Sequence, residues 1–180
     1  MQAAKIKRLV YASLFLALGM VLPFLTGQIK EIGDSLLPMH LAVMLCGLIC
    51  GPYYGGAVGI MLPFLRSLLF GMPPLYPNAV WMAVELATYG FVIGWLYAKS
   101  IKNHIAYIYV CLVASMVAGR VSWGITKSIL LGIAGKSITI GVLIADGVID
   151  AIPGIILQLL LIPFIMHLIT KRRVVRNEKN

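Results

Sequence analysis

The chain is poor in charge, and above all in acid. Asp and Glu together number six among 180 residues, charged residues make up 12% of the chain, and hydrophobic residues make up 61%. A soluble domain of this length has too little interior to hide that much apolar surface from water. Several apolar runs approach or exceed the ~18 residues that cross a ~30 Å hydrocarbon core. The composition therefore excludes a soluble domain and predicts an all-α, polytopic membrane protein.

The sequence also lacks the motifs of several enzyme classes. It contains no Walker A pattern, no HExxH, no GxSxG and no GxGxxG after a strand, so neither ATP hydrolysis nor common hydrolase chemistry is indicated. Cysteine is scarce, and Cys46, Cys50 and Cys111 all lie in apolar segments. We expect them to pack as small apolar side chains rather than to bind a metal. No cofactor is expected.

Basic residues outnumber acidic ones, and the net charge is +9. Such an excess can indicate nucleic-acid binding, but these residues flank the apolar runs, which is the positive-inside pattern. No small-x-small cleavage site follows residues 9–25, so we expect a retained first helix rather than a signal peptide. Cytoplasmic termini would leave only Lys30 and Lys136 outside, against ten basic residues inside: Lys5, Lys7, Arg8, Lys99, Lys102, Lys171, Arg172, Arg173, Arg176 and Lys179.

The apolar runs predict one domain, residues 1–180, with six membrane spans. No internal repeat is evident, which disfavours a transporter built from inverted repeats. The second span is short, and a tight turn beginning at Gly51-Pro52 separates it from the third. The predicted spans are about 9–25, 38–50, 53–71, 78–98, 105–132 and 142–169.

Ionisable residues interrupt these spans. Such residues are costly in lipid and usually mark a site or a pathway. With cytoplasmic termini, all of them fall in the outer half of the membrane, and the basic and acidic residues balance. A balanced set can pair when empty and re-pair around a polar ligand. The residues concerned are His40, Arg66, Glu85, Arg120, Lys127, Asp146 and Asp150.

Helical spacing adds aromatic and polar neighbours to this set. Residues three or four apart share one helix face, and aromatic walls with a few placed polar groups are typical of small-molecule sites. The predicted substrate-binding residues are Glu85, Arg66, Asn78, Trp81, Tyr89, Arg120, Trp123, Lys127, Asp146, Asp150 and His40.

Structural roles for the same residues stay open. Trp81 and Trp123 could belong to an interfacial belt or to packing. Arg120 could form a purely structural pair with Asp146 or Asp150, Arg66 could reach the headgroups, and His40 could be a packing residue at a helix start.

Small residues recur at four-residue spacing on several spans. Ser13 and Ala17 lie four apart on the first span, and Gly90 and Gly94 on the fourth; Gly55, Gly56 and Gly59 begin the third. Such faces let helices approach closely in lipid. They serve either packing within this bundle or docking to a separate membrane partner.

Together these features resemble the substrate-binding S component of energy-coupling factor (ECF) vitamin transporters. The stretch HLAVMLCGLICGPYYGGAVGIMLPFLRSLLFGMPP, residues 40–74, is similar to the second and third helices of that family, where an apolar helix, a Gly-Pro turn and a Gly-rich helix recur. The resemblance covers nearly the whole chain. It implies a six-helix bundle in a prokaryotic cell membrane that captures a water-soluble vitamin or precursor.

The resemblance also implies partners. A transmembrane coupling subunit and two cytosolic ATPases would drive uptake, so the chain itself would not be an enzyme. The family's Ala-xxx-Ala docking motif corresponds here to Ser13 and Ala17, and its gating lid to residues 26–37. The charges alone do not decide the substrate. The basic residues could meet a carboxylate, as in pantothenate or nicotinate, and the acidic residues could meet amines or hydroxyls, as in pyridoxine or aminopyrimidines. Pantothenate is preferred, because it offers one carboxylate, hydroxyls and an amide to a mixed lining. A self-contained facilitator or channel, an intramembrane enzyme and a structural subunit are the alternatives.

Overall fold

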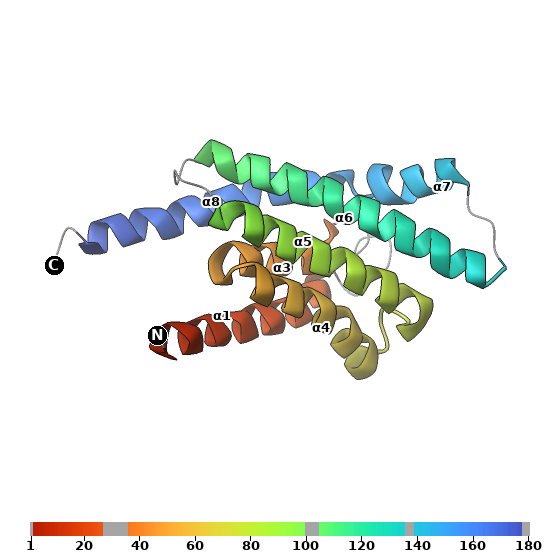
Figure 1. Cartoon of the computed structure of the whole chain (residues 1–180), viewed down its shortest axis with the longest axis horizontal. Helices are drawn as coiled ribbons and strands as arrows, with labels where there is room; N and C mark the ends of the chain where they lie inside the picture. Colours follow the sequence, from red (N-terminus) through yellow and green to blue (C-terminus); the bar gives the residue numbers. More distant parts are fainter. Residues whose placement is uncertain (1, 27–35, 100–104, 136–138, 178–180) are drawn as a thin grey trace.

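The computed structural model describes residues 2–26, 36–99, 105–135 and 139–177, and these residues form helices and turns without a strand (Figure 1). The all-α prediction is therefore confirmed. Five helices are long and apolar enough to cross a membrane, and one shorter apolar helix covers Pro38–Cys50. At 1.5 Å per residue, 13 residues extend only about 20 Å, so the count of six spans stays a prediction.

The second to fifth predicted spans match helices to within two residues, whereas the first helix begins seven residues before its predicted span and the last helix ends eight residues after its own. The main departure is the sixth predicted span, which is interrupted between two helices. In chain order the elements are α1 (Gln2–Val21), the turn η1 (Leu22–Thr26), α3 (Pro38–Cys50), α4 (Pro52–Phe70), the turn η2 (Leu75–Ala79), α5 (Val80–Ala98), α6 (Ile105–Ile133), α7 (Ile140–Ile144), the turn η3 (Ala145–Ile149) and α8 (Ile152–Asn177).

Proline and glycine set the limits of α3 and α4. Pro38 and Pro52 stand in the first turn of each helix, where a missing N–H costs nothing. Gly51 ends α3 with a φ of 100°, and Gly71 ends α4 with a φ of 69°; both angles favour glycine. Because a single residue separates α3 from α4, the two helices form a tight hairpin.

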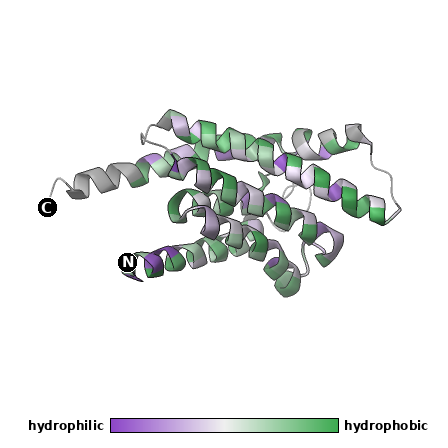
Figure 2. Ribbon diagram, viewed as in Figure 1, coloured by the Kyte–Doolittle hydropathy of each residue, from purple (hydrophilic) through white to green (hydrophobic). Residues whose placement is uncertain are grey.

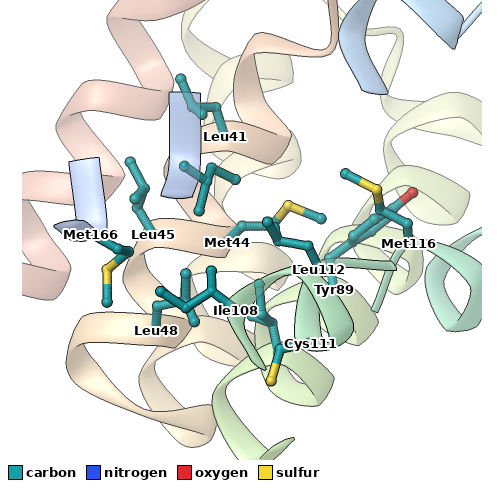
Figure 3. Close-up of a cluster of buried hydrophobic side chains, with 12 residues drawn as sticks. Leu41, Met44, Leu45, Leu48, Tyr89, Ile108, Cys111, Leu112, Met116 and Met166 are labelled. Carbon is teal, nitrogen blue, oxygen red and sulfur yellow. The ribbon is translucent and has the colours of Figure 1, made fainter. Parts of the chain in front are cut away.

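α3 lies at the centre of the bundle. Every residue from Met39 to Cys50 is buried except Ile49, and α3 contacts α1, α4, α5 and α8. Its apolar side chains join those of α5, α6 and α8 in one core cluster. Figure 3 shows Leu48 and Met166 at one end of this cluster and Tyr89 beside Met116 at the other.

Glycines bring α4 and α5 into backbone contact. A Cβ atom added at Gly90 would meet the backbone of Gly55, and one added at Gly94 would lie 2.7 Å from the nitrogen of Pro52. A Cβ atom at Gly59 would likewise meet the backbone of Leu86. In lipid, where apolar burial does not drive helices together, such close contact supplies the packing energy. These glycines therefore serve packing within the bundle, one of the two roles left open by the sequence.

Both ends of the chain lie at the same end of the bundle. Figure 1 shows the N and C marks at the left, with the turn between α4 and α5, the end of α6 and the start of α7 at the right. Figure 2 shows hydrophobic residues along all the helices, with hydrophilic residues in the first turns of α1 and others spread along α6. The distribution matches helices that face lipid along their length.

Candidate functional site

A carboxylate, a guanidinium and an imidazole meet inside the bundle. Glu85 on α5 accepts a hydrogen bond from Arg120 Nη1 on α6 at 2.9 Å. His40 on α3 places Nε2 3.3 Å from the same carboxylate oxygen, without the alignment of a hydrogen bond. Tyr89 lies edge-on to the imidazole, with ring centroids 5.0 Å apart. We call these four residues the Glu85 cluster.

Local packing explains why these side chains converge. Glu85 and Tyr89 are four residues apart on α5, so they share a face. On α6, Gly119 lies against the ring of Tyr89, where an added Cβ atom would collide with it. The missing side chain at residue 119 lets α6 approach α5, and the next residue, Arg120, then reaches Glu85.

The Glu85 cluster leaves several polar atoms without a partner. His40 Nδ1 and Nε2 and Arg120 Nε and Nη2 are buried and make no hydrogen bond in the described part of the chain. His40 and Glu85 are each 2% exposed. Buried polar groups normally have partners, because desolvation without one costs about 1–3 kcal/mol. Such unmatched atoms are a feature of functional sites.

A second cluster adjoins the first through Trp123. Lys127 Nζ donates to Asp146 Oδ2 at 2.7 Å and lies 4.5 Å from the ring centroid of Trp123 and 5.6 Å from that of Trp81. Aromatic faces attract cations at such distances. We call these four residues the Lys127 cluster. The guanidinium of Arg120 lies 5.9 Å from the same Trp123 ring, which joins the two clusters.

These pairings correct one interpretation of the sequence. Arg120 does not pair with Asp146 or Asp150; it pairs with Glu85, while Asp146 pairs with Lys127. The partner is set by the depth and rotation of α6, and the close contact at Gly119 fixes both.

Arg66 lies apart from these clusters. It is 3% exposed, so it does not extend to the headgroups. Its Nη1 donates to the carbonyl of Met20 near the end of α1 at 2.6 Å, and its guanidinium lies 5.5 Å from the rings of Phe24 and Phe70. Among the described residues, no carboxylate lies within 4 Å of it. Arg66 therefore joins α1 to α4.

Two further predicted residues are not brought into the clusters. Asn78 is half-buried in η2, and Asp150 is exposed between η3 and α8. Neither side chain makes a hydrogen bond or ion pair within the described part of the chain. The structure thus gathers His40, Trp81, Glu85, Tyr89, Arg120, Trp123, Lys127 and Asp146, and leaves out Arg66, Asn78 and Asp150.

Comparison with known families decides the class of the protein. The family described as the substrate-specific component of ECF transporters matches residues 7–170. The chain belongs to this family. It is therefore a membrane transporter subunit, and membership implies interaction with ECF coupling and ATPase subunits. Neither the curated proteins nor the solved structures gave a match.

One polar residue of this S component escaped the sequence interpretation. Gln158 on α8 is 1% exposed, and its Nε2 has no hydrogen-bond partner in the described part of the chain. It stands alone in the apolar run IILQLLL. A single amide in such an apolar run indicates a buried polar position, because polar side chains within the membrane usually face the bundle interior.

The small residues on α1 of the S component face outward. Ser13 and Ala17 are both exposed, and Ser13 Oγ donates to the carbonyl of Leu9 at 3.0 Å within its own helix. By contrast, Ala12 and Gly19 are buried against the bundle. Ser13 and Ala17 are thus left uncovered by the described part of the chain, unlike the glycines of α4 and α5. The predicted lid, residues 26–37, lies almost entirely outside the described residues.

Proposed function

We propose that this S component captures a small water-soluble vitamin or vitamin precursor between the Glu85 and Lys127 clusters. The observation that carries the proposal is the meeting of the two clusters on Trp123, with buried donors left unmatched beside it. Aromatic walls with a few convergent polar groups are typical of small-molecule sites. Ion pairs that can re-pair around a ligand suit reversible capture.

The proposed site opens to the outside of the cell. The basic residues at both ends of the chain favour cytoplasmic termini under the positive-inside rule, in a six-span bundle of one domain within a prokaryotic cell membrane. The two termini lie at one end of the bundle (Figure 1). Glu85 lies in the first turns of α5, and Lys127 lies in the last two turns of α6. α5 begins, and α6 ends, at the end of the bundle opposite to the two termini. The clusters then lie in the outer half of the membrane.

Transport energy comes from partners in this proposal. A transmembrane coupling subunit docks on the exposed Ser13–Ala17 face of α1, and two cytosolic ATPases hydrolyse ATP. Small residues at an exposed helix face permit close approach of another membrane helix. Pantothenate is our preferred substrate, since its carboxylate, hydroxyls and amide match a lining that contains both basic and acidic groups.

Tryptophan fluorescence of the purified chain tests the proposal. Trp123 is buried between the clusters, whereas Trp95 is exposed and lies 3.6 Å from Lys99 at the other end of α5. We expect pantothenate, titrated in detergent alongside the other water-soluble vitamins, to change the emission saturably. Trp95→Phe should keep that change, whereas replacement of both tryptophans of the Lys127 cluster, Trp81→Phe with Trp123→Phe, should abolish it.

A folded chain that binds no vitamin would refute the capture role. If the chain binds a vitamin but uptake by cells does not depend on ATP, a self-contained facilitator would be favoured instead. Binding and ATP-dependent uptake are measured separately, so each of these results differs from the one expected for a capture subunit.

A further inference from the structure

We infer that the ligand carries a carboxylate group, and that this carboxylate binds the Nε–Nη2 edge of Arg120. The inference rests on the proposed function and goes beyond it by assigning one chemical group of the ligand to one edge of one side chain.

Arg120 and His40 together lack hydrogen-bond partners for several nitrogen atoms among the described residues inside the bundle. Arg120 Nη1 is occupied by Glu85, while Nε and Nη2 are buried without a partner. Guanidinium nitrogens only donate, and an imidazole offers one donor and one acceptor in its neutral form and two donors in its protonated form. The unmatched atoms of the Glu85 cluster are therefore mostly donors. A ligand group that satisfies them must be rich in acceptors.

The shape of the unmatched edge of Arg120 also favours a carboxylate. Nε and Nη2 present parallel N–H bonds along one edge of a planar guanidinium, which matches the two oxygens of a carboxylate. Glu85 cannot supply both oxygens, because it already holds Nη1. The ring of Trp123, 8% exposed and 5.9 Å from the guanidinium, borders the same region. An aromatic wall excludes water and strengthens a charge-assisted hydrogen bond.

The buried charge of the two clusters also favours an anion. The side chains of Arg120 and Lys127 are 16% and 13% exposed, and that of Glu85 is 2% exposed. Asp146, the partner of Lys127, is 42% exposed, so water screens its charge more than it screens the two cations, which leaves an excess of positive charge inside the bundle. Buried charge of one sign is costly. An anionic ligand reduces that excess, whereas a cationic ligand would increase it.

Pairs of ligands that differ only at the acidic group test the inference on the unmodified protein. Suitable pairs are pantothenate with pantothenol, nicotinate with nicotinamide, and biotin with its primary amide. Whichever acid the protein recognises should bind at least about 10-fold more tightly than its neutral counterpart. Hydrogen bonds to charged groups contribute about 1.5–3 kcal/mol, which corresponds to a factor of about 10 or more in affinity.

A conservative variant then locates the contact. Arg120→Lys keeps a positive charge beside Glu85 but loses the planar edge. We expect the acid to bind at least about 10-fold more weakly to this variant, with little change for the neutral counterpart. Arg8→Lys, on the exposed start of α1, is the matched control and should leave both affinities unchanged. Thermal unfolding of each variant in detergent verifies that it is folded.

The possible outcomes separate the inference from the function on which it rests. Equal affinity for an acid and its neutral counterpart would overturn the inference and leave vitamin capture intact. Preference for a phosphorylated vitamin over every carboxylate would overturn it as well. Absence of binding to any vitamin would overturn both. A tenfold preference that Arg120→Lys abolishes would support both.

Discussion

Removal of the Glu85 carboxylate provides the sharpest test of the site's construction. Glu85→Ala leaves the guanidinium of Arg120, 16% exposed, without its carboxylate partner. Breaking a buried ion pair from one side costs about 3–5 kcal/mol, because an uncompensated charge stays behind. Arg120 keeps some exposure, so we expect Glu85→Ala to lower the free energy of unfolding by about 3 kcal/mol.

Asp146 offers a matched comparison within the same molecule. Its pair with Lys127 has a shorter distance, 2.7 Å, but the Asp146 side chain is 42% exposed. Ion pairs that water reaches contribute about 0–1 kcal/mol. Asp146→Ala should therefore cost about 1 kcal/mol or less, although its ion pair is the shorter of the two. Burial, rather than distance, decides the difference.

A double-mutant cycle isolates the pair itself. Glu85→Ala, Arg120→Ala and the combined variant are compared by equilibrium unfolding in dodecylmaltoside micelles titrated with SDS, followed by circular dichroism. We expect a coupling free energy of about 2 kcal/mol, within the range seen for contacting residues. The reasoning fails if Asp146→Ala costs as much as Glu85→Ala, or if the cycle shows no coupling.

The other predictions concern packing and docking. Gly90→Ala forces a methyl group against the backbone of α4 and should lower the free energy of unfolding by more than about 1 kcal/mol. Gly124→Ala, where nothing lies within 4 Å, should be neutral or stabilising. Equal unfolding temperatures of the two variants in detergent would contradict the close packing at Gly90. Ser13→Leu combined with Ala17→Leu should leave vitamin binding by the purified chain unchanged and reduce ATP-dependent uptake into vesicles by about 10-fold or more, and undiminished uptake would argue against docking on that face. Arg66→Met removes the bond to the carbonyl near the end of α1 and should cost about 1.5–3 kcal/mol; an unchanged free energy of unfolding would deny Arg66 a structural role.

The helices were predictable from the sequence because the hydrocarbon core of the membrane permits few backbone conformations. A segment in hydrocarbon must satisfy its own backbone hydrogen bonds, so long apolar runs become helices. Gly51 and Pro52 marked the turn between two of them, and Gly71 the end of the next. The interruption between α7 and α8 was not predicted, since the run from Gly141 to Ile169 is apolar apart from four residues, Asp146, Asp150, Gln158 and His167.

The pairing of side chains was not predictable to the same degree. Spacing placed Glu85 and Tyr89 on one face, and the structure keeps them together. Which acid Arg120 meets depends on the rotation and depth of α6, and these follow from the contact of Gly119 with Tyr89, which involves residues 30 positions apart in the sequence. The burial of α3 also depends on long-range packing, because its apolar pattern is uniform and indicates no preferred face.

The short central helix has a consequence for how the protein enters the membrane. At about 20 Å, α3 is about 10 Å too short to cross the hydrocarbon core unaided, and neighbouring helices rather than lipid surround it. Because only Gly51 separates it from α4, we expect α3 to insert together with α4 as a hairpin. It reaches its final surroundings only after α5 and α8 have been synthesised. His40 therefore meets Glu85 only once α5 has been synthesised, and Arg120 on α6 joins them afterwards, so the Glu85 cluster forms in steps as the chain emerges.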